Sequence, residues 1–544
     1  MDVDALLDGL STRDKIAQLV LPWIAGTYAA FDDDAFNRMR EWVDSLRIGG
    51  VLVSVGSPLD VAAKLNRLQE RSSLPLLVAS DLEAGTAIRL NGGTPFPPNM
   101  GVGATGSDSD AYELGRVTAL EGRAVGIHLA FAPVADVNNN PTNPIINTRS
   151  FGEDPQAVGR LVAAEIRGIQ EHGMLAGAKH FPGHGDTGTD SHITLAVSNS
   201  NWARLDSVEL VPFRSAIGAG VASIMSAHIA LPGIDGGQLR PGTVAPNVLT
   251  GILRDSLGFK GLVVTDALNM GGVANTYGAD AGVRAFLAGA DILLQPADPR
   301  VAINSMVAAV ARGEISRARL DRSVRRVLEL KRQLGLFRQR TVSLDSIPSI
   351  VGRAEFQAKA REMAGRSIVM VKDVGGLVHG LRRARPPLTL ITYGEDDHRT
   401  LGNTMAAELR ARGHAVSAFK LWPASGPASY DSAAAIITRN EVTLFASADR
   451  PVPWRGAVGL PQAMMTLIEM TARTRPTVLV SLGNPYLISA LPGVGSYLIG
   501  WRANPVTEQA VARALAGETA ITGRLPISIP PSYVRGWGVQ RRVR

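Results

Sequence analysis

One short segment of the chain concentrates side chains that can transfer protons. Between residues 179 and 192, three histidines, two aspartates and a lysine are interleaved with three glycines and one proline. Glycine and proline interrupt helix and strand periodicity, so we expect this segment to form a loop. The apolar run before it, residues 174–178, is typical of a buried strand. The pattern therefore places titratable side chains at a strand end, where active sites collect in α/β proteins.

Within this loop, Asp190 precedes His192 by two positions. Imidazole has an ordinary pKa close to neutrality, so His192 can both donate and accept a proton at pH 7. A carboxylate at this spacing can accept a hydrogen bond from one ring nitrogen, which fixes the tautomer and stabilises the imidazolium. Two alternatives remain open from the residues alone. The loop could ligate a metal, although glycine and proline exclude a helical ligand face, or it could be purely structural.

A second acidic position follows another apolar run, where Val263 and Val264 lead into Thr265 and Asp266. An acid at the carboxyl end of a barrel strand is typically catalytic. The alternative for an isolated aspartate is that it caps the next helix. Asp266 is therefore a second candidate catalytic residue.

Length and composition set the broad class. The chain has 544 residues, of which 45% are hydrophobic and 19% charged, and this length favours two domains over one core. The net charge of +7 is spread along the chain, apart from an Arg-rich end that we interpret as a solvated tail, with a nucleic-acid patch or anchoring to an anionic wall as minor alternatives. The chain has no cysteine, which excludes disulfides, thiolate nucleophiles and zinc–thiolate sites.

The sequence contains no apolar run long enough to cross a membrane. Its first ten residues are acidic and lack the apolar core of a signal peptide. For the chain as given we expect a cytoplasmic protein, with export after removal of a signal as the alternative.

The first 340 residues alternate short apolar runs with segments of helical spacing, which predicts a (β/α)8 TIM-type barrel over residues 1–340. A linker is predicted at 341–352, followed over 353–544 by a smaller αβα sandwich domain with a mainly parallel sheet. The predicted barrel strands are Lys15–Pro22, Gly50–Val55, Leu74–Ser80, His128–Pro133, Leu175–His180, Ala222–His228, Gly261–Thr265 and Asp291–Gln295. Those of the sandwich are Ser367–Val371, Leu388–Tyr393, Ala415–Leu421, Ala435–Thr438, Val442–Ala446, Thr477–Ser481, Ser496–Ile499 and Pro526–Ile529.

The loop at residues 179–192 closely resembles that of family 3 of the glycoside hydrolases, specifically the bacterial β-N-acetylglucosaminidases. Those proteins carry Lys-His-(Phe/Ser)-Pro-Gly-His-Gly-Asp-Thr followed by Asp-Ser-His, and the match here is nearly letter for letter. The resemblance implies that Asp266 is the nucleophile of a retaining mechanism. It also implies that His192 is the general acid/base, oriented by Asp190, in place of the carboxylic acid that most glycosidases use.

The resemblance extends to residues that would bind the sugar. The segment starting at Asp81 resembles the family's Asp-Gln-Glu-Gly-Gly, with Leu82 and Ala84 replacing Gln and Gly, which leaves the fine shape of the sugar subsite open. The segment 149–155 resembles the family's Arg-Ser-Phe-Gly-x-Asp-Pro, and its first residue, Arg149, would bind sugar hydroxyls. The substrate-binding residues implied are Asp81, Arg89, Arg149, Lys179 and His180.

The expected function is that of a retaining exo-β-N-acetylglucosaminidase. Its substrates would be GlcNAc-containing oligosaccharides, either peptidoglycan fragments such as muropeptides or chitooligosaccharides. We expect a monomer without a metal or other cofactor, without a nucleic-acid partner and without a membrane span. One alternative is a β-N-acetylglucosaminide phosphorylase, because a neutral histidine does not repel an incoming phosphate dianion. The others are a β-glucosidase or xylosidase of the same fold, and a non-catalytic sugar-binding protein.

Overall fold

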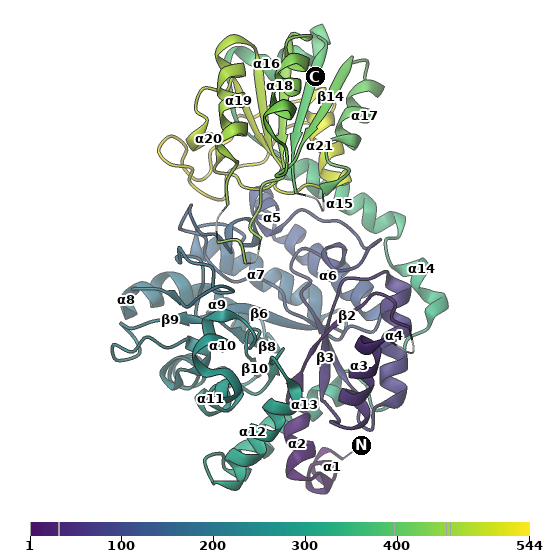
Figure 1. The fold of residues 1–544 in the computed structure, drawn as a ribbon, viewed down its shortest axis with the longest axis vertical. Helices are drawn as coiled ribbons and strands as arrows, with labels where there is room; N and C mark the ends of the chain where they lie inside the picture. The colour runs from purple at the N-terminus through teal and green to yellow at the C-terminus, as the bar shows by residue number, and fades with distance from the viewer. Residues whose placement is uncertain (1, 31–32, 396–397, 453, 457, 544) are drawn as a thin grey trace. The chain divides into compact units, whose positions relative to one another are not determined.

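The computed structural model describes residues 2–30, 33–395, 398–452, 454–456 and 458–543 (Figure 1). The chain forms two compact units, each built around its own sheet. The barrel unit comprises Met1–Thr94, Ala111–Val137 and Val158–Phe356, and the sandwich unit comprises Pro95–Asp110, Asn138–Ala157 and Gln357–Arg544. Among the described residues, no helix is both long enough and apolar enough to span a lipid bilayer.

The barrel unit contains a ring of parallel strands. Seven form one sheet in the order β10-β8-β6-β5-β4-β3-β2, β1 pairs with β11, and a bridge from Val264 to Ile292 links β10 to the residues before β11. The ring therefore closes, and the predicted (β/α)8 barrel is confirmed. The strands are β1 (Val20–Leu21), β2 (Trp23–Ala25), β3 (Gly50–Ser54), β4 (Leu77–Ser80), β5 (Leu129–Ala130), β6 (Leu175–Phe181), β8 (Ser223–Ser226), β10 (Leu262–Val264) and β11 (Leu293–Leu294).

Helices surround these strands, and local capping explains where several begin. Ser57 caps α4 with Pro58 in the first turn, and Ser316 accepts a hydrogen bond from the first turn of α13. The longer helices are α3 (Asp34–Asp44), α4 (Pro58–Arg71), α6 (Asp108–Ala124), α7 (Pro155–Gln170), α9 (Leu210–Gly218), α11 (Ala281–Ala288), α12 (Pro299–Ala311) and α13 (Arg317–Gln333). Shorter ones are α1 (Val3–Gly9), α2 (Thr12–Ala17), α8 (Trp202–Arg204), α10 (Gly271–Tyr277), α14 (Ile347–Ile350) and the π-helical segment Asn247–Ser256. A small pair, β7 (Ala196–Val197) and β9 (Ile229–Ala230), lies outside the ring.

The first predicted strand, Lys15–Pro22, is wrong in its first half. Residues Thr12–Ala17 form helix α2, which begins because the Ser11 hydroxyl accepts a hydrogen bond from the Asp14 backbone N–H. Only Val20–Leu21 of the predicted range is strand, and the chain continues as β2 after Pro22.

The sandwich unit has a six-stranded sheet in the order β12-β17-β16-β15-β13-β14. β12 runs antiparallel to β17 and all other pairs are parallel, which fits the mainly parallel sheet predicted. Side chains alternate between two cores, as in a sheet covered on both faces: Leu444 belongs to one core and Phe445 to the other. The strands are β12 (Val369–Asp373), β13 (Leu388–Tyr393), β14 (Val416–Leu421), β15 (Val442–Ser447), β16 (Thr477–Ser481) and β17 (Ser496–Ile499). The helices are α5 (Asn99–Thr105), α15 (Ala354–Ser367), α16 (Leu377–Ala384), α17 (Asn403–Ala411), α18 (Pro427–Ile437), α19 (Gln462–Thr474), α20 (Leu487–Ala490) and α21 (Pro505–Leu515).

Two predicted strands of this unit are wrong. Residues Ala435–Ile437 are the last turn of α18 and Thr438 is its C-cap. The prediction failed because a run of three apolar residues does not distinguish a strand from the buried face of a helix. Residues Pro526–Ile529 make only an isolated bridge from Ile529 to Tyr533, and the leading proline has no N–H to donate to a ladder.

Candidate active site

Most of the predicted site residues lie at the carboxyl ends of barrel strands. Asp81 follows β4 directly, Lys179 and His180 lie near the end of β6, and Asp266 comes two residues after β10. Parallel strands place their carboxyl ends at the same end of a barrel, so these residues share one face of the barrel unit.

Lys179 is the centre of an ionic network at this face. Its Nζ lies 2.7 Å from Asp81 Oδ1 and 2.7 Å from Glu83 Oε1, and Arg89 Nη2 lies 3.5 Å from Asp81 Oδ2. Burial alone would raise the pKa of Asp81, but Lys179 and Arg89 reverse that effect and leave the pKa below its ordinary value. Asp81 is therefore an ionised acceptor suited to sugar hydroxyls. Sequence reasoning did not select Glu83, although its spacing of two from Asp81 was a usable signal.

His180 is held by an aspartate that sequence reasoning missed. Asp136 Oδ2 lies 2.7 Å from His180 Nδ1, and Asp136 Oδ1 accepts a 2.6 Å hydrogen bond from the His184 backbone N–H. Burial would raise the pKa of Asp136, but the two histidines lower it below its ordinary value. The buried carboxylate thus sets the tautomer and direction of His180. The signal was present, because Asp136 follows an apolar run, as Asp266 does.

An irregularity in β6 explains how two consecutive residues both serve the site. The pairing of β6 with β8 shifts register between Ala178 and Phe181, the stretch that contains Lys179 and His180. Such irregularities in strand pairing re-aim side chains next to active sites. Lys179 can therefore bond to Asp81 while its neighbour His180 bonds to Asp136.

The structure contains the Asp190–His192 hydrogen bond predicted from the spacing. Asp190 Oδ1 lies 2.8 Å from His192 Nδ1 and also accepts a 2.9 Å hydrogen bond from the His192 backbone N–H. The Asp190 side chain is 1% exposed and that of His192 is 20% exposed. Asp190 thus orients the imidazole through Nδ1, and Nε2 is the nitrogen that can exchange a proton with a bound substrate.

A buried histidine organises the loop around this pair. His184 Nδ1 lies 2.6 Å from Thr187 Oγ1, and His184 Nε2 lies 2.9 Å from Ser191 Oγ. Burial lowers the pKa of His184 to about 4, so the ring is neutral at pH 7. His184 therefore shapes the loop by bonding to the serine that lies between Asp190 and His192.

Backbone hydrogen bonds tie the same loop to the segment that follows Asp266. Gly271 N donates to His192 O at 3.0 Å, and Gly272 N donates to Ser191 O at 3.1 Å. A Cβ at Gly271 would lie 2.3 Å from the backbone oxygen of Ile193, the residue that follows this loop, so a side chain there would prevent the close approach. The two candidate catalytic elements are therefore joined directly.

Asp266 lies among positive or polarisable groups that keep it ionised. Its Oδ1 accepts a 2.8 Å hydrogen bond from Ala267 N. Burial would raise the pKa of Asp266, but electrostatic interactions with the neighbouring imidazoles of His228, His180 and His192 outweigh burial and lower it below its ordinary value. An ionised carboxylate near a histidine with an exposed edge can act as a nucleophile beside a general acid.

His228 fixes the backbone next to Asp266. Its Nε2 lies 2.9 Å from Ala267 O and its Nδ1 lies 2.8 Å from Thr243 Oγ1. Burial lowers the pKa of His228, so the ring is neutral and can donate to that carbonyl from Nε2. His228 thus holds the peptide that carries the Asp266 hydrogen bond.

Arg149 belongs to the sandwich unit, so its sugar-binding role stays a prediction. It ends a short 3-10 helix, Asn147–Arg149, and its Nη1 donates to Ile145 O at 3.0 Å. In the same unit, Asp154 accepts a hydrogen bond from Ala157 N and so caps the start of α7, where Pro155 is the first residue.

The histidines of the loop do not gather around one point. Within the described part of the chain, no cluster of three or more His, Cys, Asp or Glu side chains could hold a metal ion. His180, His184 and His192 instead bond to Asp136, Ser191 and Asp190, respectively.

A parallel (β/α)8 barrel with an ionised carboxylate and an oriented histidine at its strand ends is typical of a glycoside hydrolase. Residues 11–330 match the model of the glycosyl hydrolase family 3 N-terminal domain, and the chain belongs to this family. The resemblance found in the sequence is thereby confirmed.

Comparisons with individual proteins extend beyond the barrel. The β-N-acetylglucosaminidase/β-glucosidase of Cellulomonas fimi is 32% identical over 502 residues, which cover 89% of this chain and 88% of that protein. The structure of a glycoside hydrolase family 3 β-N-acetylglucosaminidase from Paenibacillus sp. str. FPU-7 matches with a TM-score of 0.87 and 31% identity, covering 96% of this chain and 99% of that one. The structure of the β-glucoside phosphorylase BglX bound to 2FGlc matches with a TM-score of 0.88 and 25% identity, covering 97% and 96%.

Proposed function

We propose that this protein is a retaining exo-β-N-acetylglucosaminidase that releases terminal GlcNAc. The observation that carries the proposal is the Asp190–His192 pair on a loop bonded through its backbone to residues 271–272, just after Asp266. The Cellulomonas and Paenibacillus relatives, which carry this activity in their names, support it.

In the first step, an Asp266 carboxylate oxygen attacks the anomeric carbon while the bond from that carbon to the glycosidic oxygen breaks. The proton on His192 Nε2 goes to the departing oxygen, and Asp190 stabilises the imidazole through Nδ1. In the second step, Nε2 takes a proton from water, whose oxygen attacks the anomeric carbon and releases Asp266 as carboxylate. The two steps together restore ionised Asp266 and protonated His192, and no cofactor is consumed.

The ionic network after β4 is suited to holding the terminal sugar. Ionised Asp81 can accept hydrogen bonds from two adjacent hydroxyls, and Arg89, Lys179 and His180 can donate to others. Arg149 would add a further donor, as the family resemblance implies. Peptidoglycan fragments and chitooligosaccharides both present a terminal β-GlcNAc, and we propose these two classes as natural substrates.

Phosphorolysis is the second candidate reaction, and one observation favours it. The acid/base group is a histidine, which is neutral after it has given its proton to the leaving group, so it does not repel a phosphate dianion. The fold shared with a β-glucoside phosphorylase at 25% identity supports the same candidate. In this reaction, phosphate would replace water in the second step and give a sugar 1-phosphate.

Rates on p-nitrophenyl β-N-acetylglucosaminide and on the matching β-glucoside, each with and without phosphate, test both candidates. We expect preference for the N-acetyl sugar, free GlcNAc as product and no effect of phosphate. A rate that rises with phosphate and yields sugar 1-phosphate would instead establish the phosphorylase. Preference for the glucoside would contradict the proposed substrate, and absence of turnover on either would contradict catalysis.

A further inference from the structure

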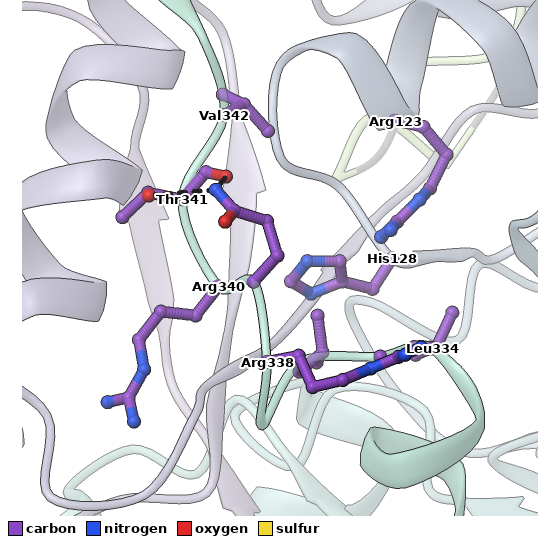
Figure 2. Close-up of a pocket in the computed structure, with 10 residues that line it drawn as sticks. Arg123, His128, Leu334, Arg338, Arg340, Thr341 and Val342 are labelled. Atoms are coloured by element: carbon purple, nitrogen blue, oxygen red, sulfur yellow. Dashed lines mark hydrogen bonds between the residues drawn. The ribbon is translucent and has the colours of Figure 1, made fainter.

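A cavity lined by basic residues lies at the amino-terminal end of the barrel strands. It has a volume of about 500 Å³, within the range of small-molecule sites. Arg123 at the end of α6, His128 just before β5 and the segment 334–342 that follows α13 line it (Figure 2). Because His128 precedes β5 whereas Asp136 follows it, this cavity and the candidate active site belong to opposite ends of the strands.

The cavity wall carries positive charge without a carboxylate. Arg123, Arg338 and Arg340 line it, and its ten lining residues include no Asp or Glu. Buried Lys331 lies close enough to Arg340 for that charge to lower the lysine's pKa. An anion entering this cavity would therefore meet several cations whose charge is not balanced locally.

Arg123 is the least compensated of these cations. Its Nη1 is buried and finds no hydrogen-bond partner among the described residues, and burial lowers the pKa of its guanidinium. Other described arginines with a buried, unpartnered nitrogen each keep an ion pair with a carboxylate. These are Arg89, Arg353, Arg412 and Arg513. A desolvated guanidinium without a counter-ion is costly, so the arrangement favours binding of an anion.

His128 adds a neutral donor at the same place. Its Nδ1 accepts a 3.0 Å hydrogen bond from Val78 N, so the ring proton lies on Nε2. Burial, with the charges of Arg123 and Lys331, lowers the pKa of His128 well below its ordinary value. Figure 2 shows the His128 ring with Arg123 and Arg338 around the same cavity.

Arg340 has a different role from the other two arginines. Its Nη1 donates to the backbone oxygens of Gln69, at 3.4 Å, and of Ser72, at 2.9 Å. These bonds fix the start of the 340–342 segment and leave Arg340 to contribute mainly its charge. The donors available to a ligand are thus those of Arg123, His128 and exposed Arg338.

We propose that this cavity binds a phosphate group, either inorganic phosphate or the phosphate of a small ester. Guanidinium groups bind phosphate oxygens through paired N–H donors, and a dianion matches the surplus of positive charge better than a single carboxylate. Arg123 and His128 Nε2 form the inner contacts and Arg338 the outer one. The site is independent of the proposed glycosidase chemistry, since it shares no residue with it.

Isothermal titration calorimetry with inorganic phosphate at constant ionic strength tests the site in the wild type, Arg123→Gln, Arg338→Gln and Arg38→Gln. Arg38 is an exposed arginine of α3 outside the cavity, so its variant loses the same charge as a matched control. We expect one saturable site in the wild type and in Arg38→Gln. Loss of one charge-assisted hydrogen bond should weaken binding about tenfold to a hundredfold in each cavity variant.

Unchanged phosphate affinity in both cavity variants, or no saturable binding in the wild type, would overturn the proposal. Exposed Arg338 keeps the test valid if Arg123→Gln does not fold, which circular dichroism would report. Citrate provides the carboxylate comparison: binding of citrate but not of phosphate would overturn the phosphate assignment. Hydrolysis in phosphate-free buffer should be unchanged in all three variants, so failure of this proposal and failure of the glycosidase proposal are distinguishable.

Discussion

The two ends of the barrel strands handle charge in opposite ways. At the carboxyl end, the basic groups of the barrel unit that we assign to the site lie against carboxylates: Lys179 and Arg89 share Asp81, His180 faces Asp136, and His192 faces Asp190. At the amino end, cations outnumber carboxylates. Pairing one carboxylate with one basic group keeps a proton mobile and a tautomer defined, whereas surplus positive charge holds structure or attracts an anion.

Asp291 shows the structural use of charge at the amino end. This fully buried carboxylate lies 2.7 Å from Arg254, 3.3 Å from Arg319 and 3.0 Å from Arg326, and it also accepts from Val263 N. Three guanidinium groups therefore depend on one carboxylate just before β11. The Arg123 cavity differs because no carboxylate lines it.

Removing the candidate nucleophile should have the largest effect. Asp266→Asn keeps the side-chain shape but cannot form the glycosyl–enzyme bond, so kcat should fall by about 10⁴-fold or more while the protein stays folded. Steady-state kinetics and circular dichroism measure both. The control is Asp186→Asn. Asp186 is a half-exposed aspartate of the same loop that pairs with Arg204, so this variant should keep most activity. Activity retained in Asp266→Asn would exclude Asp266 as the nucleophile.

His192→Ala should separate proton donation from the rest of the mechanism. Substrates with poor leaving groups, such as chitobiose, should lose about 10²- to 10⁴-fold in kcat/KM, because their leaving oxygen needs a proton. Activated dinitrophenyl glycosides should lose far less in their first step. Exposed His379→Ala serves as the control. Equal losses on both substrates would show that His192 is not the general acid.

Asp291→Asn tests the cluster of three arginines around Asp291 at the amino end of the barrel strands. Leaving three buried or half-buried arginines without their carboxylate should lower the free energy of unfolding by about 3–5 kcal/mol. Urea denaturation measures this value. Asp298→Asn is the control, because Asn caps helix α12 about as well as Asp and should change stability little. An exposed ion pair contributes at most about 1 kcal/mol. A decrease in the free energy of unfolding below this value would therefore contradict the structural role of Asp291.

Lys331, at the amino end of the barrel strands, should make the free energy of unfolding depend on pH. Burial lowers the pKa of Lys331 from 10.5 to about 7. Between these values the unfolded chain binds one proton more than the folded chain, so stability should rise with pH by about 1.4 kcal/mol per unit above pH 7. Lys331→Met should remove this slope between pH 7 and 9, as followed by denaturation at each pH. An identical slope in the variant would show that another group causes it.

Ser191→Ala should have the smallest effect on activity, and it tests whether His184 positions the loop that carries Asp190 and His192. It removes the hydroxyl that lies 2.9 Å from His184 Nε2 but leaves the Asp190–His192 pair in place. Loss of one neutral hydrogen bond of about 0.5–1.5 kcal/mol should lower kcat by about twofold to tenfold, with KM nearly unchanged. Thr187→Ala, at the other His184 nitrogen, should behave alike if His184 positions the loop. A change in KM alone would instead indicate a contact with substrate.

Periodicity and strand-end polarity were enough to predict the barrel, because fully buried parallel strands are uninterrupted apolar runs. The same rule failed where the run was short. Residues Ala435–Ile437 continue a helix begun at Pro427, and Lys15 lies in a helix capped by Ser11. A run of three apolar residues fits the helical period as well as the strand period, and only the packing around it decides.

Asp136 and Glu83 show the same limit within the site. Each is an acid beside a predicted strand, yet nothing local distinguishes it from a helix cap or a surface acid. Their role in the site depends on their partners. Asp136 bonds to His180 and Glu83 to Lys179, which are more than 40 residues away in the chain and meet them only in the folded barrel.

Local sequence thus determined the strand series, the loop with its Asp190–His192 pair and the family, because these depend on spacing and residue type along the chain. Tertiary structure alone decided which carboxylate serves which basic group. It also decided that the Nη1 of half-buried Arg123 is enclosed without a carboxylate, because these outcomes depend on desolvation and on the meeting of distant segments.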